Sequence, residues 1–180
     1  MYKKPKLMRT ICLAVLMAAS ALAGAAEPKK LAFVDTGNTG RSVSAEALAN
    51  VIIGKTGEKV AVISRAVDID PYDIKPEVNA ATLLQQRGID VTAHRSVQIT
   101  TNDVKHSDVI LTMTEKHKSK LIELFPDAKN KTFTLAEYST GKHVDVPDAW
   151  GKPIEVYVEM IKQLDAFIHA ALEKIVETPI

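Results

Sequence analysis

One segment near the start of the chain restricts the fold more than any other. The apolar run Leu31–Val34 leads into a loop of small residues that begins at Asp35 and closes on Arg41, and the helix-forming stretch Ala45–Leu48 follows. A short buried strand, a tight loop and a helix start make a βα unit whose loop amides lie beside a helix N-terminus. The segment therefore predicts an α/β fold with an anion-binding loop.

The rest of the chain repeats this alternation of short apolar runs and helical patterns. The predicted strands are Leu31–Val34, Val60–Ile63, Val109–Leu111 and Lys131–Leu135, and the predicted helices are Ser44–Ile53, Glu77–Gln86, Lys116–Phe125 and a long last helix with an apolar stripe at Val158, Ile161, Leu164, Ile168, Leu172 and Ile175. Alternating strands and helices favour a parallel sheet covered on both faces. Ligands of such sheets bind at the carboxyl ends of the strands, where the loop 35–41 lies.

The amino-acid composition indicates the class of protein but does not indicate a binding partner. The chain has 180 residues, of which 46% are hydrophobic and 25% charged, values typical of one soluble domain. Its net charge of +1 gives no reason to expect a nucleic-acid partner. There is no internal repeat and no linker long enough to separate two domains.

The first 25 residues differ in kind from the rest. Lys3, Lys4, Lys6 and Arg9 precede the uncharged apolar run Ile11–Leu22, and Ala23-Gly-Ala25 has the small-x-small form of a cleavage site. We predict a Sec-type signal peptide over 1–25, a folded domain over 26–180, a periplasmic or secreted location and no stable membrane span after cleavage. An uncleaved anchor is the alternative, which the short apolar run disfavours.

Cleavage would also change the chemistry of the chain. It removes four basic residues and no acidic ones, so the mature chain has 19 basic and 22 acidic residues and a net charge of −3. It also removes Cys12, the only cysteine, so that neither a disulfide nor a thiol nucleophile is available to the mature domain.

The loop residues themselves suggest an oxyanion site. Gly37 and Gly40 permit backbone conformations in which successive amides point at one anion. Arg41 offers a planar fork for two oxygens of phosphate or sulfate, and Asn38 and Ser42 can brace the loop. An ordinary strand-to-helix turn with a surface arginine is the alternative interpretation at this point.

Several motifs in order carry a resemblance to a known family. Phe33-Val-Asp-Thr-Gly-Asn-Thr-Gly-Arg-Ser42 resembles the low-molecular-weight protein tyrosine phosphatase signature Val-Cys-x-Gly-Asn-x-Cys-Arg-Ser. Further matches follow at Arg87–Asp90 with Ala93–Arg95, at Ser107–Met113 and at Asp145–Gly151. The resemblance implies a phosphatase I-like fold: one α/β domain of three layers, with a short central parallel sheet of about four strands flanked by helices.

The resemblance also implies roles for individual residues. Asp148 corresponds to the general acid that protonates the leaving oxygen, and Trp150 to an aromatic residue at the entrance of the site. Asp70 stands where the family has a ring-gripping aromatic residue, with Tyr72 two residues on, so Asp70, Tyr72 and Trp150 are expected to line the substrate site. The expected phosphate-binding residues are Thr36, Gly37, Asn38, Thr39, Gly40, Arg41 and Ser42.

Two positions depart from the signature and leave two functions open. Asp35 stands at the place of the nucleophilic cysteine, and Gly40 at the place of the second cysteine. One function is a phosphomonoester hydrolase with Asp35 as nucleophile and Arg41 and Asp148 as its partners, for which a divalent cation such as Mg²⁺ would offset charge. The other is an inactive pseudophosphatase that binds an inorganic oxyanion, a phosphorylated small molecule or a phosphoprotein.

The remaining sequence patterns give weaker evidence of function. Asp35-Thr-Gly37 matches an aspartic-protease tripeptide, but that chemistry needs two such carboxylates and the chain has one copy. The histidines have no ligand spacing, so we expect no zinc site. We expect no metal-ligating site residues and no resident cofactor, apart from the divalent cation that a nucleophilic Asp35 would need. We expect His94 to brace the fold near the loop, and the cluster Lys116-His-Lys118-x-Lys120 to lie on a solvated helix face.

Overall fold

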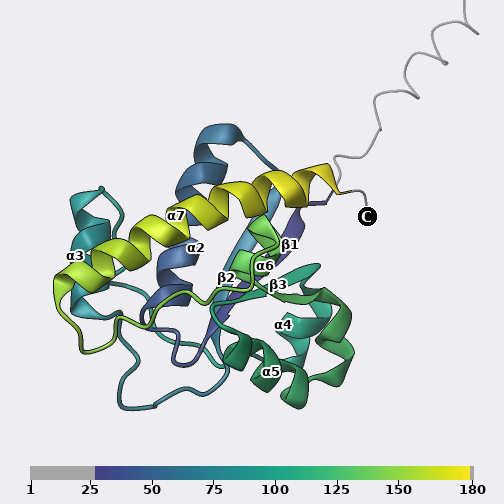
Figure 1. Cartoon of the computed structure of the whole chain (residues 1–180), viewed down its shortest axis with the longest axis horizontal. Coiled ribbons are helices and arrows are strands. Elements are labelled where there is room, and N and C mark those ends of the chain that lie inside the picture. Colours follow the sequence, from purple (N-terminus) through teal and green to yellow (C-terminus); the bar gives the residue numbers. More distant parts are fainter. Residues whose placement is uncertain (1–26, 179–180) are drawn as a thin grey trace, which may run out of the picture.

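Four parallel strands form the centre of the domain. The computed structural model describes residues 27–178, and its sheet has the strand order β2-β1-β3-β4 (Figure 1). The strands are β1 (Lys29–Asp35), β2 (Val60–Ala66), β3 (Val109–Thr112) and β4 (Thr132–Thr134). Each overlaps a predicted strand, and the prediction of one α/β domain with about four parallel strands is confirmed.

Helices cover both faces of this sheet. One face is covered by α2 (Arg41–Thr56), α3 (Val78–Gln86), α6 (Leu135–Thr140) and α7 (Ile154–Glu177), and the other by α4 (Thr101–His106), α5 (Glu115–Leu124) and the 3-10 helix η3 (Pro126–Lys131). Figure 1 shows α7 crossing over α2, with α4 and α5 away from it. The three-layer arrangement was predicted from the alternation of strands and helices.

Strand periodicity divides the core into two clusters. Leu31 and Phe33 face the helices α2 and α7, whereas Ala32 and Val34 face α4 and α5, because successive side chains of a strand point to opposite faces. The apolar stripe of α7 packs into the larger cluster, as predicted. Val158 is the exception: the buried stripe begins at Tyr157 and continues through Met160 and Ile161, and Val158 lies on the exposed side.

Two six-residue helices, α4 and α6, were not predicted as helices. Each begins with a capping box, in which a threonine hydroxyl accepts the amide of the residue three positions on and the side chain of that residue accepts the threonine amide. The residues are Thr100 with Asp103, and Thr134 with Glu137. Capping, rather than a long apolar stripe, defines these helices.

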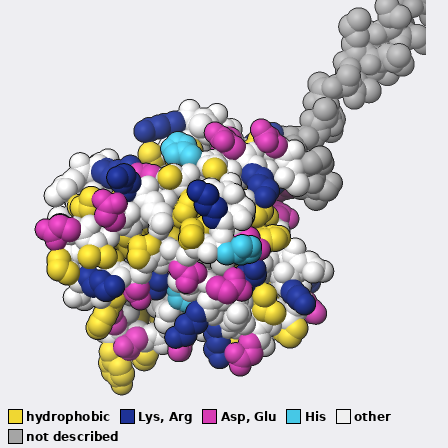
Figure 2. Space-filling model, in the orientation of Figure 1, with side chains coloured by type: hydrophobic (Ala, Val, Ile, Leu, Met, Phe, Trp, Pro, Cys, Tyr) yellow, Lys and Arg dark blue, Asp and Glu magenta, His cyan; other side chains and the backbone are white. Residues whose placement is uncertain are grey.

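Charged and hydrophobic side chains lie together on the surface of the molecule (Figure 2). On the face in Figure 2, charged side chains of both signs are interspersed with hydrophobic ones. Within residues 27–178, no helix combines the length and the apolar character needed to cross a bilayer. The predicted signal peptide, residues 1–25, lies outside the described residues.

Candidate functional site

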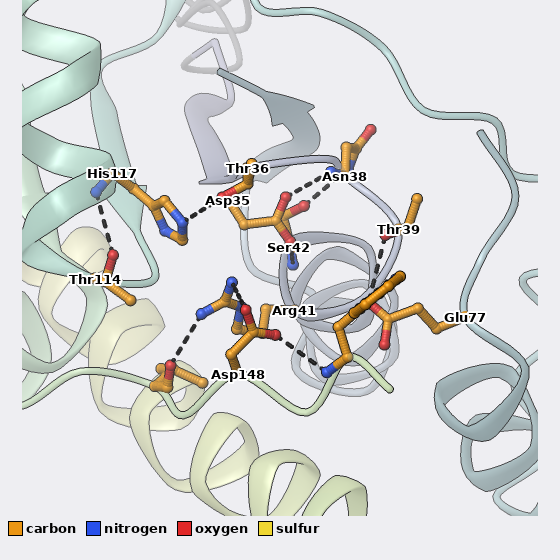
Figure 3. Close-up of polar contacts among 12 residues, drawn as sticks. Asp35, Thr36, Asn38, Thr39, Arg41, Ser42, Glu77, Thr114, His117 and Asp148 are labelled. Atoms are coloured by element: carbon orange, nitrogen blue, oxygen red, sulfur yellow. Dashed lines mark hydrogen bonds and ion pairs between the residues drawn. The ribbon is translucent and has the colours of Figure 1, made fainter. Parts of the chain in front are cut away.

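The loop between β1 and α2 is built around the Asp35 carboxylate. Asp35 ends β1 and is only 3% exposed. Its Oδ1 accepts a hydrogen bond from the amide of Asn38 at 2.6 Å, and its Oδ2 accepts one from the amide of Ser42 at 2.8 Å (Figure 3). The carboxylate therefore lies inside the loop and accepts one amide of the loop and one amide of the first turn of α2.

Other amides of this loop remain available. Among the described residues, no acceptor receives a hydrogen bond from the amides of Gly37, Thr39, Gly40 or Arg41. Gly40 precedes α2 and provides no side-chain cap. Free amides at a helix N-terminus favour a negatively charged group, so the loop keeps the chemistry of an oxyanion site although Asp35 uses two of its donors.

Asn38 holds the loop in place. It has a φ of 58°, a left-handed conformation that asparagine tolerates better than most residues. Its Nδ2 donates to Ser42 Oγ at 2.9 Å, and its Oδ1 accepts from the amide of Val97 at 3.1 Å. Its carbonyl oxygen lies 3.0 Å from both His94 Nε2 and Ser96 Oγ, so the expected contribution of His94 to bracing this region is confirmed.

Arg41 connects the loop to a second segment of the chain. Its Nη2 lies 3.2 Å from Asp148 Oδ2, and its Nη1 donates to the carbonyl oxygen of Val146 at 3.3 Å. Asp148 is 58% exposed in its side chain, and its Oδ1 accepts from the amide of Trp150. The loop carrying Asp148 is itself anchored, because the Val146 amide donates to the carbonyl oxygen of Met113, the residue that follows β3.

These residues line a cleft of about 280 Å³. Its walls include most of the predicted site residues: Asp35, Thr36, Gly37, Thr39, Arg41, Asp70, Asp148 and Trp150. Asn38 and Ser42 are not in this lining; their side chains hydrogen-bond to each other and hold the loop in shape. Gly40 is the residue immediately before α2. Tyr72 is not part of the lining: it is 97% exposed in the turn after Asp70.

The sequence did not indicate that three further carboxylates, Asp68, Asp73 and Glu77, also line this cleft. Together with Asp35, Asp70 and Asp148 they make six acidic side chains around Arg41, the one basic residue of the lining. Burial raises the pKa of Glu77, with further contributions from the nearby charges of Asp148 and Asp35. The cleft is thus strongly acidic around a site built for an oxyanion.

His117 corrects a prediction. We expected the segment Lys116-His-Lys118 to be a solvated face, yet His117 is 5% exposed and its Nε2 lies 2.9 Å from Thr36 Oγ1. Burial, followed by the charge of Arg41, lowers the pKa of His117 to about 4, so the imidazole is neutral at pH 7. The expectation failed because the loop of β1 covers this part of α5, which helix pattern alone does not reveal.

The described residues do not form a preorganised set of metal ligands at this site. In the described part of the chain, no group of three or more histidine, cysteine, aspartate or glutamate side chains is placed to hold a metal ion. The carboxylates of the cleft lie instead in hydrogen bonds and one ion pair, as with Asp35, Asp148 and Glu77.

The fold and the site together define an α/β protein with a phosphate-type loop at the carboxyl end of its first strand. The family model of the low molecular weight phosphotyrosine protein phosphatase matches residues 30–178. The chain belongs to that family.

Individual relatives support the same assignment. A protein-arginine-phosphatase of Geobacillus stearothermophilus is 37% identical over 148 residues, covering 82% of this chain and 97% of the relative. The crystal structure of a Bacillus subtilis YwlE mutant is similar with a TM-score of 0.78 and 33% identity, covering 82% and 98% of the two chains. A low molecular weight protein tyrosine phosphatase from T. tengcongensis gives 0.77 and 33%, covering 81% and 99%.

Proposed function

We propose that this protein binds a phosphorylated ligand through the loop 36–42 and does not hydrolyse phosphotyrosine by the thiolate route. The observation that carries the proposal is the position of Asp35, whose two carboxylate oxygens accept the amides of Asn38 and Ser42. In this proposal Asp35 replaces the nucleophilic cysteine of the family. A carboxylate bound in this way stabilises the loop but is a weaker nucleophile than a thiolate.

Ligand binding would use the donors that Asp35 leaves free. The amides of Gly37, Thr39, Gly40 and Arg41 have no acceptor among the described residues, and Arg41 can turn its guanidinium from Asp148 to the ligand. A guanidinium matches two phosphoryl oxygens with parallel hydrogen bonds. Relatives of this chain are named for protein-arginine and protein-tyrosine phosphatases, so a phosphorylated arginine or tyrosine side chain is the ligand class we propose.

Hydrolysis by Asp35 is the second candidate, and it is favoured because Asp148, in the position of the family's general acid, lines the same cleft as Asp35. An oxygen of Asp35 would attack phosphorus, the bond to the leaving atom would break, and Asp148 would give that atom its proton. Water would then cleave the acyl phosphate, which releases phosphate and restores the Asp35 carboxylate, and the proton lost by the attacking water would return Asp148 to its protonated form. A divalent cation such as Mg²⁺ would offset the charge of this reaction.

Binding and turnover measured on the same samples separate the two candidates. We expect isothermal titration calorimetry to detect inorganic phosphate or phospho-amino acids, and we expect no release of phosphate from phosphotyrosine or phosphoarginine, with or without Mg²⁺. The variant Asp35→Cys is the matched control, because it restores a thiol to the loop and should gain turnover. Wild-type turnover that disappears in Asp35→Asn would favour hydrolysis, and absence of all binding would contradict both candidates.

We also propose that residues 1–25 direct export to the periplasm or medium. The proposal rests on the basic start, the short apolar run and the Ala23-Gly-Ala25 site. Expression of the full chain in a Gram-negative host, followed by fractionation and N-terminal sequencing, should give a periplasmic protein that begins at Ala26. A cytoplasmic protein that retains residues 1–25 would contradict the proposal.

A further inference from the structure

A carboxylate occupies the space beside Gly40. If residue 40 had a Cβ, that atom would overlap Glu77 Oε1 and lie 2.8 Å from Glu77 Cδ. Gly40 has a negative φ of −122°, outside the left-handed region that favours glycine. The absent side chain therefore has a local consequence: it makes room for Glu77 next to the loop.

Three hydrogen bonds hold Glu77, two through its carboxylate and one through its backbone amide. Its Oε2 accepts a hydrogen bond from the Tyr157 hydroxyl of α7, and its Oε1 lies 3.4 Å from Thr39 Oγ1. Its backbone amide donates to the carbonyl oxygen of Thr39 at 2.9 Å, immediately before α3 begins. In Figure 3, Glu77 and Thr39 lie on one side of the loop and His117 lies on the other.

Such a carboxylate restricts what can bind beside it. Glu77 lines the same cleft as Arg41, and five other acidic side chains share that lining. A phosphoryl group alone is repelled by these charges, whereas N–H donors next to the phosphoryl group can satisfy a carboxylate acceptor. A phosphorylated guanidinium supplies the phosphoryl group and the N–H donors together, but a phosphorylated phenol supplies no donor.

We infer that Glu77 is a specificity-determining residue, which selects a phosphorylated guanidinium group over a phosphorylated phenol. The inference rests on the proposed function, since it concerns the ligand of the same loop. Gly40 and Tyr157 act through Glu77: Gly40 leaves the space, and Tyr157 positions the carboxylate. The six acidic residues contribute a general field. Among them, Asp35 accepts two amides from inside the loop and Asp148 pairs with Arg41. Glu77 instead lies beside Gly40 and Thr39, where the Tyr157 hydroxyl holds its carboxylate.

Calorimetric titrations of three probes test this inference: phospho-L-arginine, phospho-L-tyrosine and inorganic phosphate. In the wild-type protein, phosphoarginine should bind more tightly than phosphotyrosine. We expect Glu77→Gln to reduce the ratio of the two affinities about tenfold, as loss of a hydrogen bond to a charged group does. Gly40→Ala should reduce the same ratio, because its Cβ displaces the Glu77 carboxylate without changing residue 77.

Asp73→Asn is the matched control for charge, since Asp73 is an exposed carboxylate of the same cleft. It should reduce the ratio much less than Glu77→Gln does, because Asp73 contributes only to the general field of the cleft. An equal fall in Asp73→Asn, or an unchanged ratio in folded Glu77→Gln or Gly40→Ala, would overturn the inference while phosphate binding still supports the proposed function. A wild-type protein that binds none of the three probes would overturn the proposed function and this inference with it.

Discussion

Asn38 combines an uncommon backbone conformation with two side-chain hydrogen bonds, to Ser42 and to the amide of Val97. We expect Asn38→Ala to lower the free energy of unfolding by about 2–4 kcal/mol, because both side-chain hydrogen bonds are lost and alanine is strained at positive φ. Urea denaturation measures this change. Asn38→Gly should cost less than Asn38→Ala, since glycine relieves the strain.

The control for this measurement is Asn50→Ala on the exposed side of α2. It should change the free energy of unfolding by less than about 0.5 kcal/mol. If Asn38→Ala and Asn50→Ala behave alike, the loop does not depend on the Asn38 side chain.

His117 makes folding depend on pH. Its pKa is lowered from 6.5 to about 4 by burial and by Arg41, so the unfolded chain binds a proton at this residue more readily than the folded protein does. Its contribution to stability is therefore fully present above about pH 6.5 and is lost as the pH falls towards 4. Between these two pH values, the free energy of unfolding falls by up to about 1.4 kcal/mol for each unit by which the pH falls, because of His117.

Replacing His117 with glutamine should flatten this part of the pH profile. The measurement is a set of urea midpoints between about pH 4.5 and 7. The exposed His106 on α4 provides the comparison, and His106→Gln should keep the wild-type slope. Identical slopes for wild type and His117→Gln would show that other groups control the acid side of the profile.

At the scale of the elements, the short helix α6 depends on its first residues. Thr134 Oγ1 accepts the Glu137 amide at 3.1 Å, and Glu137 Oε2 accepts the Thr134 amide at 3.2 Å. We expect Thr134→Ala to cost about 1 kcal/mol of unfolding free energy, the usual cost of losing an N-cap. Thermal and urea denaturation measure it.

Ser139→Ala is the comparison within the same helix. Ser139 Oγ donates only to carbonyl oxygens of the preceding turn, at Leu135 and Ala136, which are also part of the helix backbone ladder. Its removal should cost less than removal of the Thr134 cap. The opposite order would contradict the importance of the capping box.

The elements differ in how far the sequence predicts them. β1, β3 and α7 follow from apolar runs and helical spacing, because these patterns reflect burial against the sheet. The helices α4 and α6 carry a detectable signal, Thr-x-x-Asp and Thr-x-x-Glu, but each is too short for a hydrophobic stripe. Hydrogen bonds at their first residues define these two helices, and such bonds leave no periodic apolar pattern in the sequence.

At the scale of the whole molecule, the limits of prediction concern contacts between distant segments. The motif resemblance predicted that Asp148 lies near Arg41, and the structure brings them together. Glu77 and Tyr157 belong to no motif, and they meet only because α3 and α7 pack on the same face of the sheet. The same is true of His117, which the loop of β1 buries.

Ligand binding should stabilise the whole domain through Arg41. In the free protein its guanidinium binds Asp148 and the carbonyl oxygen of Val146, so one side chain links α2 to the loop before α7. Phosphate at about 100 times its Kd should raise the free energy of unfolding by about 2.7 kcal/mol if it binds only the folded state. Urea denaturation with and without phosphate, at matched ionic strength with chloride, measures the increment.

Arg41→Ala should reduce this increment to near zero at the same phosphate concentration, because the four free amides alone lack the charge and the paired donors of the guanidinium. Arg41→Lys should recover only part of it, since an ammonium group cannot make the bidentate contact. An increment that persists undiminished in Arg41→Ala would mean that phosphate stabilises the protein from outside the loop. The proposed binding site would then be wrong even if the domain binds phosphate.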